Sequence, residues 1–86
     1  MIILTHKNFD KSFRKIPAKI KAKFYERMDI FILDEFDFRL RNHPLSGEYK
    51  GSRSIDITGD WRVLYERKNE QAVLLIDIGT HSQLYG

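Results

Sequence analysis

One arginine and two aspartates have spacings that a β-sheet would bring together. Asp56 and Arg62 lie on either side of a turn at residues 58–60, so a hairpin there places their side chains opposite each other. A second hairpin brings Asp77 beside Arg62 on the same face. Arginine binds phosphate oxygens through a planar fork that is always charged, and a carboxylate either moves protons or neutralises the arginine. The central strand would therefore display an arginine flanked by two aspartates on the face that the apolar residues do not use.

Three histidines add side chains that exchange protons near neutral pH: His6, His43 and His81. Their spacing matches no metal-ligand pattern, the chain has no cysteine, and it has no glycine-rich phosphate loop. We therefore expect no metal and no cofactor. On sequence alone, His43 before Pro44 is more typical of a solvated turn, and His81 is more typical of a C-terminal tail.

The apolar residues fix the register of the first hairpin. Ile55 and Ile57 alternate with polar residues before the turn, and Trp61 and Val63 do so after it. Matching the apolar faces pairs Ile57 with Trp61 and Ile55 with Val63. A shift by one residue would put Asp56 among the apolar side chains, so the sequence specifies this pairing strongly.

The elements before this hairpin predict a strand and two helices. A short apolar strand at residues 2–5 comes first. Asn8 can cap a helix over residues 8–16, and Pro17 begins a second one over residues 18–37. Apolar residues recur in both at helical spacing, so each helix has one apolar face.

The full order is then β-α-α-β-β-β, an α+β domain. A polar loop at residues 39–52 precedes three strands, of which the last matches Ile76 to Val63, and residues 79–86 form an irregular tail. We expect an antiparallel sheet with both helices packed on one face and the other face free. The expected core includes Phe13, Phe24, Met28, Ile55, Val63 and Ile76.

Length and charge set the class of protein. Eighty-six residues make one domain, residues 1–86, with a formal net charge of +3 that permits a nucleic-acid partner. Basic residues gather between residues 7 and 27. The apolar runs are too short to span a bilayer and the N-terminus lacks the apolar segment of a signal peptide, so we expect a cytoplasmic protein without a membrane partner.

Four short motifs occur in a distinctive order. They are His43-Pro44-Leu45-x-Gly47, Arg53, Asp60-Trp61-x-x-x-Tyr65 and Gly79-Thr80-His81-Ser82. This series resembles the YafQ branch of the RelE/ParE toxins of bacterial type II toxin–antitoxin systems. The resemblance covers the whole chain, including the order of its elements, and is most specific between residues 43 and 85.

The resemblance implies a RelE-like fold and a ribosome-dependent endoribonuclease that cuts messenger RNA in the A site. It also implies a cognate antitoxin that silences the enzyme. The family's catalytic positions fall on His43, Asp60, His81 and Tyr85. Its substrate-binding positions fall on Arg53, Trp61 and Arg62. Asp56 stands where the YafQ pattern has a histidine and Asp77 where it has an arginine, so these two are modified site positions.

Metal-independent RNA cleavage explains why such residues are needed. The 2′-hydroxyl attacks the adjacent phosphorus, which requires a base, an acid for the leaving oxygen and positive charge for the phosphorane. Asp56 could act as the base or orient a histidine. Asp77 near the phosphate would repel it unless Arg53 or Arg62 neutralises the carboxylate.

Two other functions stay open. The first is a ParE-like toxin that binds DNA gyrase without cutting RNA, which the histidines and Asp60-Trp61 argue against. The second is a catalytically impaired member that mainly binds its antitoxin, for which Asp56 and Asp77 are the motivation. On sequence alone, Trp61 is more typical of the sheet core than of a platform on which bases stack.

Overall fold

A mixed five-stranded sheet organises the protein, and it follows the order β1-β5-β4-β3-β2. The computed structural model describes residues 1–85. Its strands are β1 (Ile2–Thr5), β2 (His43–Pro44), β3 (Arg53–Asp56), β4 (Trp61–Arg67) and β5 (Ala72–Thr80). Its helices are α1 (Lys7–Phe13), α2 (Ala18–Leu33) and α3 (His81–Tyr85), with 3-10 turns η1 (Phe38–Leu40) and η2 (Gly47–Tyr49). The predicted α+β class is confirmed.

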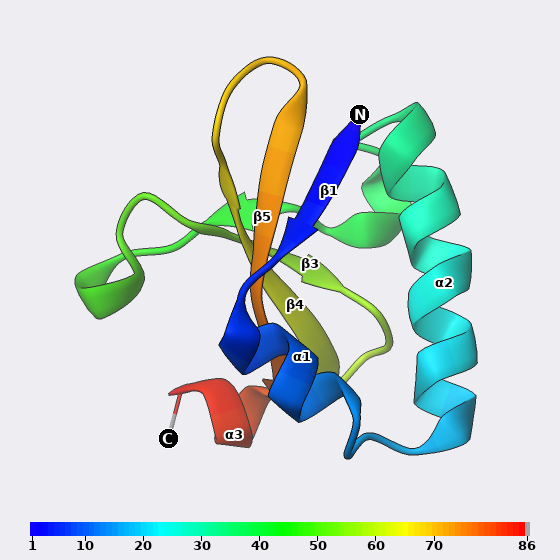
Figure 1. Ribbon diagram of the computed structural model, residues 1–86. Helices are drawn as coiled ribbons and strands as arrows, with labels where there is room; N and C mark the ends of the chain where they lie inside the picture. Colours follow the sequence, from blue (N-terminus) through cyan, green and yellow to red (C-terminus); the bar gives the residue numbers. More distant parts are fainter. Residues whose placement is uncertain (86) are drawn as a thin grey trace.

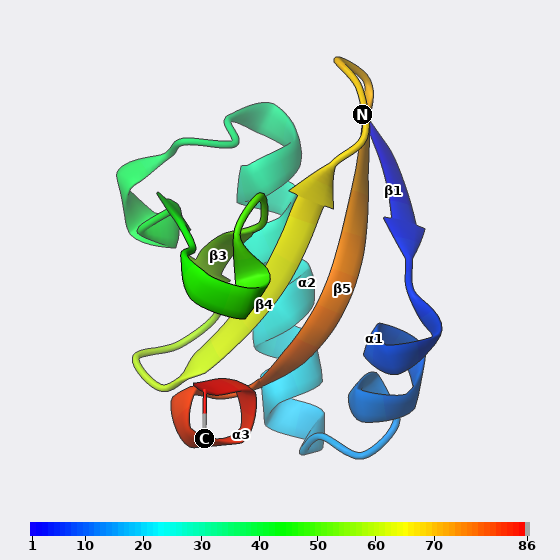
Figure 2. The ribbon, with the colours of Figure 1, turned by 90° about the vertical axis from the view of Figure 1, so that its left-hand side faces the viewer.

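The sheet is antiparallel except at one edge. Strands β2 to β5 pair antiparallel, as expected, whereas β1 pairs parallel to β5. A parallel neighbour needs a long connection, and here both helices and three strands separate β1 from β5. In Figure 2 the sheet runs from β1 at one side to β3 at the other, with α2 behind it and α3 at its lower end.

The core lies between α2 and the sheet (Figure 1). Phe31 packs edge-on against Tyr65 of β4, with ring centroids 5.0 Å apart. Phe24 joins the two helices because its ring lies 5.6 Å from Phe9 and 5.0 Å from Phe13. Of the expected core, Phe13 is partly buried and four residues are fully part of the core: Phe24, Met28, Ile55 and Val63.

The register of β3 against β4 is as predicted, and that of β4 against β5 is not. Ile55 faces Val63, but Val63 faces Ile78 rather than Ile76. A bulge between Leu64 and Tyr65 leaves Ile76 outside the core cluster. The sequence could not distinguish these registers, because a shift by two residues keeps every side chain on its face.

The helix boundaries also differ from those predicted. His6, not Asn8, caps α1, since its Nδ1 accepts from the backbone N–H of Asn8 at 3.0 Å. Helix α2 ends at Leu33 because Asp34 takes an extended backbone conformation. Phe36, which lies within the predicted helix over residues 18–37, is outside α2 and is 62% exposed. The predicted irregular tail instead contains α3, while residue 86 of that tail lies outside the described residues.

Candidate functional site

The face of the sheet opposite α2 carries Asp56 of β3 and Arg62 of β4. Cross-strand partners share a face, so Asp56 and Arg62 project together. Arg62 Nε lies 3.0 Å from Asp56 Oδ1, as the predicted register requires. Arg62 Nη1 also donates to the carbonyls of Thr58 and Gly59, at 3.3 and 2.8 Å. Arg62 therefore stabilises the β3–β4 turn by hydrogen bonds and forms an ion pair with Asp56.

Asp77 does not join this pair, which corrects the predicted triad. It lies opposite Leu64, two residues along β4 from Arg62. Its Oδ1 accepts from Ser12 Oγ of α1 at 2.7 Å and from the backbone N–H of Ile78 at 2.8 Å. The physical reason is the two-residue difference in register, which moves Asp77 along the sheet to α1. The carboxylate is thus directed toward α1 and not toward Asp56.

Asp60, His81 and Tyr85 meet where β5 ends. The backbone N–H of His81 donates to the Asp60 carbonyl at 3.0 Å, which joins the β3–β4 turn to α3. His81 and Tyr85 lie one helical turn apart, and their ring centroids are 4.8 Å apart. His81 and Asp60 are both exposed. Their exposure leaves an imidazole and a carboxylate open to a substrate from two separate segments.

A reciprocal cap holds α3 in this position. Thr80 Oγ1 accepts from the Gln83 N–H at 3.2 Å, and Gln83 Oε1 accepts from the Thr80 N–H at 2.8 Å. This arrangement is a capping box, which a threonine followed three residues later by glutamine could have predicted. Gly79 allows the close approach, because a Cβ there would lie 3.3 Å from Leu84 Cγ.

His43 lies in β2, an edge strand of the sheet. It pairs with Ser54 in the short strand β2, and its Nδ1 lies 2.9 Å from the carbonyl of Arg41. Strands β3 and β4 therefore lie between His43 and β5. The other predicted catalytic residues, Asp60, His81 and Tyr85, form a group that does not include His43. Ser54 Oγ is fully buried on this face and has no hydrogen-bond partner among residues 1–85.

Arg53 lies on the other face, away from His81. Its Nε donates to Asn42 Oδ1 at 2.7 Å, and its guanidinium lies 5.2 Å from the centroid of the Phe36 ring. Asn42 in turn donates to the Tyr65 hydroxyl at 2.7 Å. Burial, together with the hydrogen bond to Glu35, raises the pKa of Tyr65 well above its ordinary value. Arg53 is therefore part of a polar cluster that supports Tyr65, on the face of the sheet that α2 covers.

Three residues that the sequence did not single out lie at the site. Tyr49 from η2 donates its hydroxyl to the Leu84 carbonyl at 3.3 Å, and its ring meets Tyr85 edge-on at 6.2 Å. Burial raises the pKa of the Tyr49 hydroxyl, so it stays a donor. Arg41 has a left-handed backbone (φ 49°) and places Nε 3.7 Å from Asp56. The third is Ser54. Arg41 and Tyr49 lie in irregular segments, which leave no periodic signal in a sequence, whereas Ser54 lies in β3.

A basic pocket of about 230 Å³ lies beside Asp56. Its charged walls are the guanidiniums of Arg27 from α2, and of Arg39 and Arg41 from the segment around η1. Arg27 Nε donates to the Ile57 carbonyl at 3.3 Å, and Arg39 pairs with Asp37, whose pKa falls to about 2 through that hydrogen bond. Because arginines outnumber carboxylates here, the pocket suits an anion.

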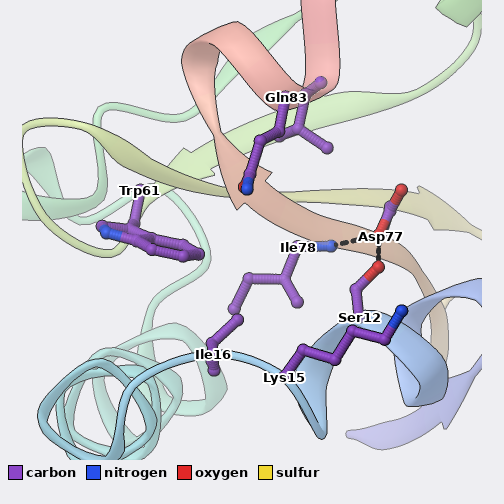
Figure 3. Close-up of a pocket in the computed structure, with 8 residues that line it drawn as sticks. Ser12, Lys15, Ile16, Trp61, Asp77, Ile78 and Gln83 are labelled. Carbon is purple, nitrogen blue, oxygen red and sulfur yellow. Dashed lines mark hydrogen bonds between the residues drawn. The ribbon is translucent and has the colours of Figure 1, made fainter.

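A second pocket of about 270 Å³ lies between α1, the end of β5 and α3. Trp61, at the start of β4, and Asp77 are among its lining residues (Figure 3). Trp61 also packs against the hydrophobic core, so it contributes to both the core and the pocket. Within residues 1–85, no cluster of three or more histidines and carboxylates is arranged to hold a metal, and no helix has the length and apolarity to cross a membrane.

Comparison with known proteins gives a family match over the whole chain. The model for YafQ, the bacterial toxin of a type II toxin–antitoxin system, matches residues 1–86. No curated protein matches the sequence. Solved structures extend the likeness, beginning with YafQ from E. coli strain BL21(DE3), at 22% identity and a TM-score of 0.80, over 98% of this chain and 97% of that chain.

Two further structures share the fold. The E. coli DinJ–YafQ toxin–antitoxin complex matches with 23% identity and a TM-score of 0.77, over 98% of this chain and 96% of that chain. The YoeB/ParE toxin from Agrobacterium tumefaciens matches with 19% identity and a TM-score of 0.76, over 94% of this chain and 99% of that chain. At these identities the structures establish the fold alone, and the family match carries the assignment.

Proposed function

The chain belongs to the YafQ family of bacterial toxins of type II toxin–antitoxin systems, and from this premise we propose that it is a ribosome-dependent endoribonuclease of messenger RNA. The proposed enzyme acts in the cytoplasm, in the ribosomal A site, and needs neither metal nor cofactor. The observation that carries the proposal is the meeting of Asp60, His81 and Tyr85 at the end of β5.

The proposed reaction transfers two protons and exchanges one P–O bond for another. A base takes the proton of the 2′-hydroxyl, whose oxygen bonds to the adjacent phosphorus. The bond from phosphorus to the 5′ oxygen breaks, and an acid protonates that oxygen. The products are a 2′,3′-cyclic phosphate and a 5′-hydroxyl. Each positioned acid or base contributes roughly 10²–10⁴-fold to the rate.

We assign proton transfer to Asp60 and His81, which the turn and α3 bring together. Tyr85 packs on the His81 ring and fixes its direction, as the 4.8 Å centroid separation suggests. Tyr85 also offers an aromatic face for a base. His43, in the edge strand β2, contacts the RNA on the side of the scissile phosphate opposite from α3. Trp61 stays a predicted substrate contact beside Asp60.

The positive charge for the phosphate comes from Arg41 and Arg62 in this proposal. Among residues 1–85, Arg62 has no partner at Nη2, whereas its Nε and Nη1 bind Asp56 and the turn. Arg41 is 80% exposed and its ion pair with Asp56 is long, at 3.7 Å, so its guanidinium can turn toward RNA. Arg53, predicted as a substrate contact, is held on the other face and acts here as support for Tyr65.

We also propose a cognate antitoxin as the protein partner. The support is the E. coli relative, which was solved in a complex with the antitoxin DinJ. An antitoxin that binds this chain should suppress both its RNA cleavage and its effect on growth.

Primer extension on a translated message tests the proposed function. A message with a mutated start codon is the matched control, because it has the same sequence but carries no translating ribosomes. We expect cuts in the translated message alone. Cuts in both messages would reject ribosome dependence. A wild-type protein that makes no cut and does not slow growth would instead favour the catalytically impaired alternative, which the commitment of Arg62 to Asp56 supports.

A further inference from the structure

The imidazole of His43 is held by a main-chain carbonyl. Its Nδ1 lies 2.9 Å from the carbonyl oxygen of Arg41, two residues earlier in the chain. A carbonyl oxygen can only accept, so the proton of this hydrogen bond belongs to Nδ1. In a neutral imidazole one nitrogen carries the proton and the other has a lone pair. The contact therefore selects the neutral form of His43 that has its proton on Nδ1 and its lone pair on Nε2.

The backbone conformation of Arg41 directs this carbonyl. Arg41 has φ 49° and ψ 44°, a left-handed conformation that residues with a Cβ seldom adopt, and within residues 1–85 no other residue except glycine has a positive φ. The conformation ends η1, where the Arg41 N–H donates to the Phe38 carbonyl at 3.2 Å. An extended backbone at this residue would point the carbonyl in another direction. Strained backbone at a functional site often fixes a geometry, and here it coincides with the contact to His43.

His43 projects from the sheet face that carries Asp56 and Arg62. It pairs with Ser54 of β3, and Ser54 lies two residues from Asp56, so these side chains share one face. His43 is exposed, and its Nε2 has no hydrogen-bond partner among residues 1–85. The bonding directions of the two ring nitrogens diverge widely, so a ring bound through Nδ1 has Nε2 directed away from the Arg41 carbonyl. The lone pair of Nε2 is therefore available to a ligand on this face.

We propose that Arg41 is a positioning residue that fixes this tautomer, so that His43 Nε2 accepts a hydrogen bond from a 2′-hydroxyl of the RNA. The RNA contact rests on the proposed nuclease function. A nitrogen that has only a lone pair needs a donor, and within the sugar–phosphate backbone only the 2′-hydroxyl can donate. Every ribonucleotide has this group and every deoxyribonucleotide lacks it. His43 would therefore contribute to a preference for RNA over DNA of the same sequence.

His6 supplies an internal control, because its contact requires the opposite tautomer. His6 Nδ1 accepts from the backbone N–H of Asn8 at 3.0 Å, so the proton of its neutral ring belongs to Nε2. Long-range proton–nitrogen correlation spectra of isotope-labelled protein distinguish the two forms, since a protonated ring nitrogen resonates far upfield of one with a lone pair. At a pH where the ring shifts no longer change, we expect the proton on Nδ1 in His43 and on Nε2 in His6. Free histidine favours Nε2, so the same tautomer in both residues would overturn the proposal.

Two substitutions separate the backbone of Arg41 from its side chain. Glycine adopts a positive φ freely, so Arg41→Gly should keep the proton of His43 on Nδ1. Valine is β-branched and disfavours this conformation, so Arg41→Val should move the proton toward Nε2. Both variants lose the same guanidinium, so a difference between them comes from the backbone. The His6 signals should stay unchanged in both, and a folded Arg41→Val protein with the wild-type tautomer at His43 would contradict the role of Arg41.

Fluorescence anisotropy tests the RNA contact with a short single-stranded RNA and the DNA of the same sequence. The wild type and Arg41→Gly should bind the RNA roughly two- to tenfold more tightly than the DNA, which is the range that one net hydrogen bond contributes. Arg41→Val and His43→Phe should lose most of this preference. The ratio of the two affinities is compared, because both Arg41 variants also lose a positive charge and should bind both nucleic acids more weakly.

Equal binding of RNA and DNA by the wild type would overturn the contact with the 2′-hydroxyl, and so would an unchanged preference in His43→Phe. Neither measurement needs a ribosome, so both are independent of the nuclease assay. The expected tautomer and RNA preference in a protein that cuts no message would reject the proposed function alone. RNA cleavage by a protein whose His43 carries its proton on Nε2 would reject the present inference alone.

Discussion

Ser12 and Asp77 are separated by 65 positions in the sequence, and Ser12 Oγ donates to Asp77 Oδ1 at 2.7 Å. This hydrogen bond links α1 to β5 and turns the carboxylate away from the ion pair of Asp56 and Arg62. In the proposed reaction, this direction would reduce the repulsion between the aspartate and the phosphate of the RNA. Asp77, which stands where the family pattern has an arginine, therefore has a structural role: it joins α1 to the sheet.

Replacing Asp77 with arginine tests whether repulsion limits the reaction. Since the carboxylate is directed toward Ser12, we expect Asp77→Arg not to accelerate RNA cleavage. We also expect it to lower the unfolding free energy by about 1–3 kcal/mol, because the hydrogen bonds to α1 and Ile78 are lost. Primer extension and urea denaturation measure the two effects. Faster cleavage by the variant would show that Asp77 does act on the phosphate.

The contact between the helices depends on Phe24. Its ring joins Phe9 and Phe13 to the sheet core and is only 6% exposed. Phe24→Ala should lower the unfolding free energy by about 3–5 kcal/mol, a large share of the stability of a small domain. Leu33→Ala on the same helix is the control, because Leu33 is 89% exposed and should change stability by less than about 0.5 kcal/mol. Equal midpoints for the two variants in thermal melts would contradict the packing.

The basic pocket beside Asp56 should bind the RNA backbone. Arg41 is exposed there, so Arg41→Gln should weaken binding of a short single-stranded RNA. It should also reduce the slope of log K against log salt by about 0.7, the contribution of one phosphate contact. Arg14→Gln removes an equal charge from the residue that follows α1, outside the basic pocket, and serves as the control. Fluorescence anisotropy at several salt concentrations would measure both, and identical slopes would remove Arg41 from the interface.

The stability of the fold should fall in alkaline solution because of Tyr65. Burial and the hydrogen bond to Glu35 raise its pKa, so the native state retains the proton after the unfolded chain has lost it. The native state then binds more protons above about pH 10, the ordinary tyrosine pKa, and stability decreases as the pH rises through this range. Below that pH the contribution is fully present.

Urea denaturation between pH 8 and pH 11 would measure this effect of Tyr65. Tyr65→Phe should show a smaller decrease than the wild type, while Tyr25→Phe, at a 60% exposed position, should follow the wild type. A Tyr65→Phe protein whose stability falls as steeply as that of the wild type would assign the alkaline loss to other groups.

The pairing of β3 with β4 could be predicted from the sequence because a charged residue excluded the alternative strand registers. Asp56 fixed the β3–β4 register, since any slip by one residue would bury its charge. The repeat Ile76-Asp77-Ile78 imposed no such restriction on β5, because a shift by two residues places one isoleucine where the other would be. The predicted pairing of Val63 with Ile76 was therefore wrong, and Val63 pairs with Ile78. Apolar spacing extended α2 to Phe36, although the contacts of that residue are with Arg53 and not with the core. The irregular backbone at Asp34 had no counterpart in the pattern.

The candidate site was predictable only where a family motif named its residues. Asp60 comes from the β3–β4 turn, and His81 and Tyr85 come from α3; no periodicity indicates that these two segments meet. The capping box of Thr80 and Gln83 could have revealed α3 and with it the spacing of His81 and Tyr85. Arg41 and Tyr49 stay invisible to such reasoning, because long-range packing positions the loops that carry them.

The central claim is tested most directly by the rate of RNA cleavage after His81→Ala. If His81 transfers a proton in the reaction, primer extension on a translated message should show cleavage reduced by about 10²–10⁴-fold. His6→Asn is the matched histidine control, because asparagine can still cap α1 and His6 lies outside the site. The account predicts that this control cleaves at the wild-type rate. A folded His81→Ala protein that also cleaves at the wild-type rate would contradict it.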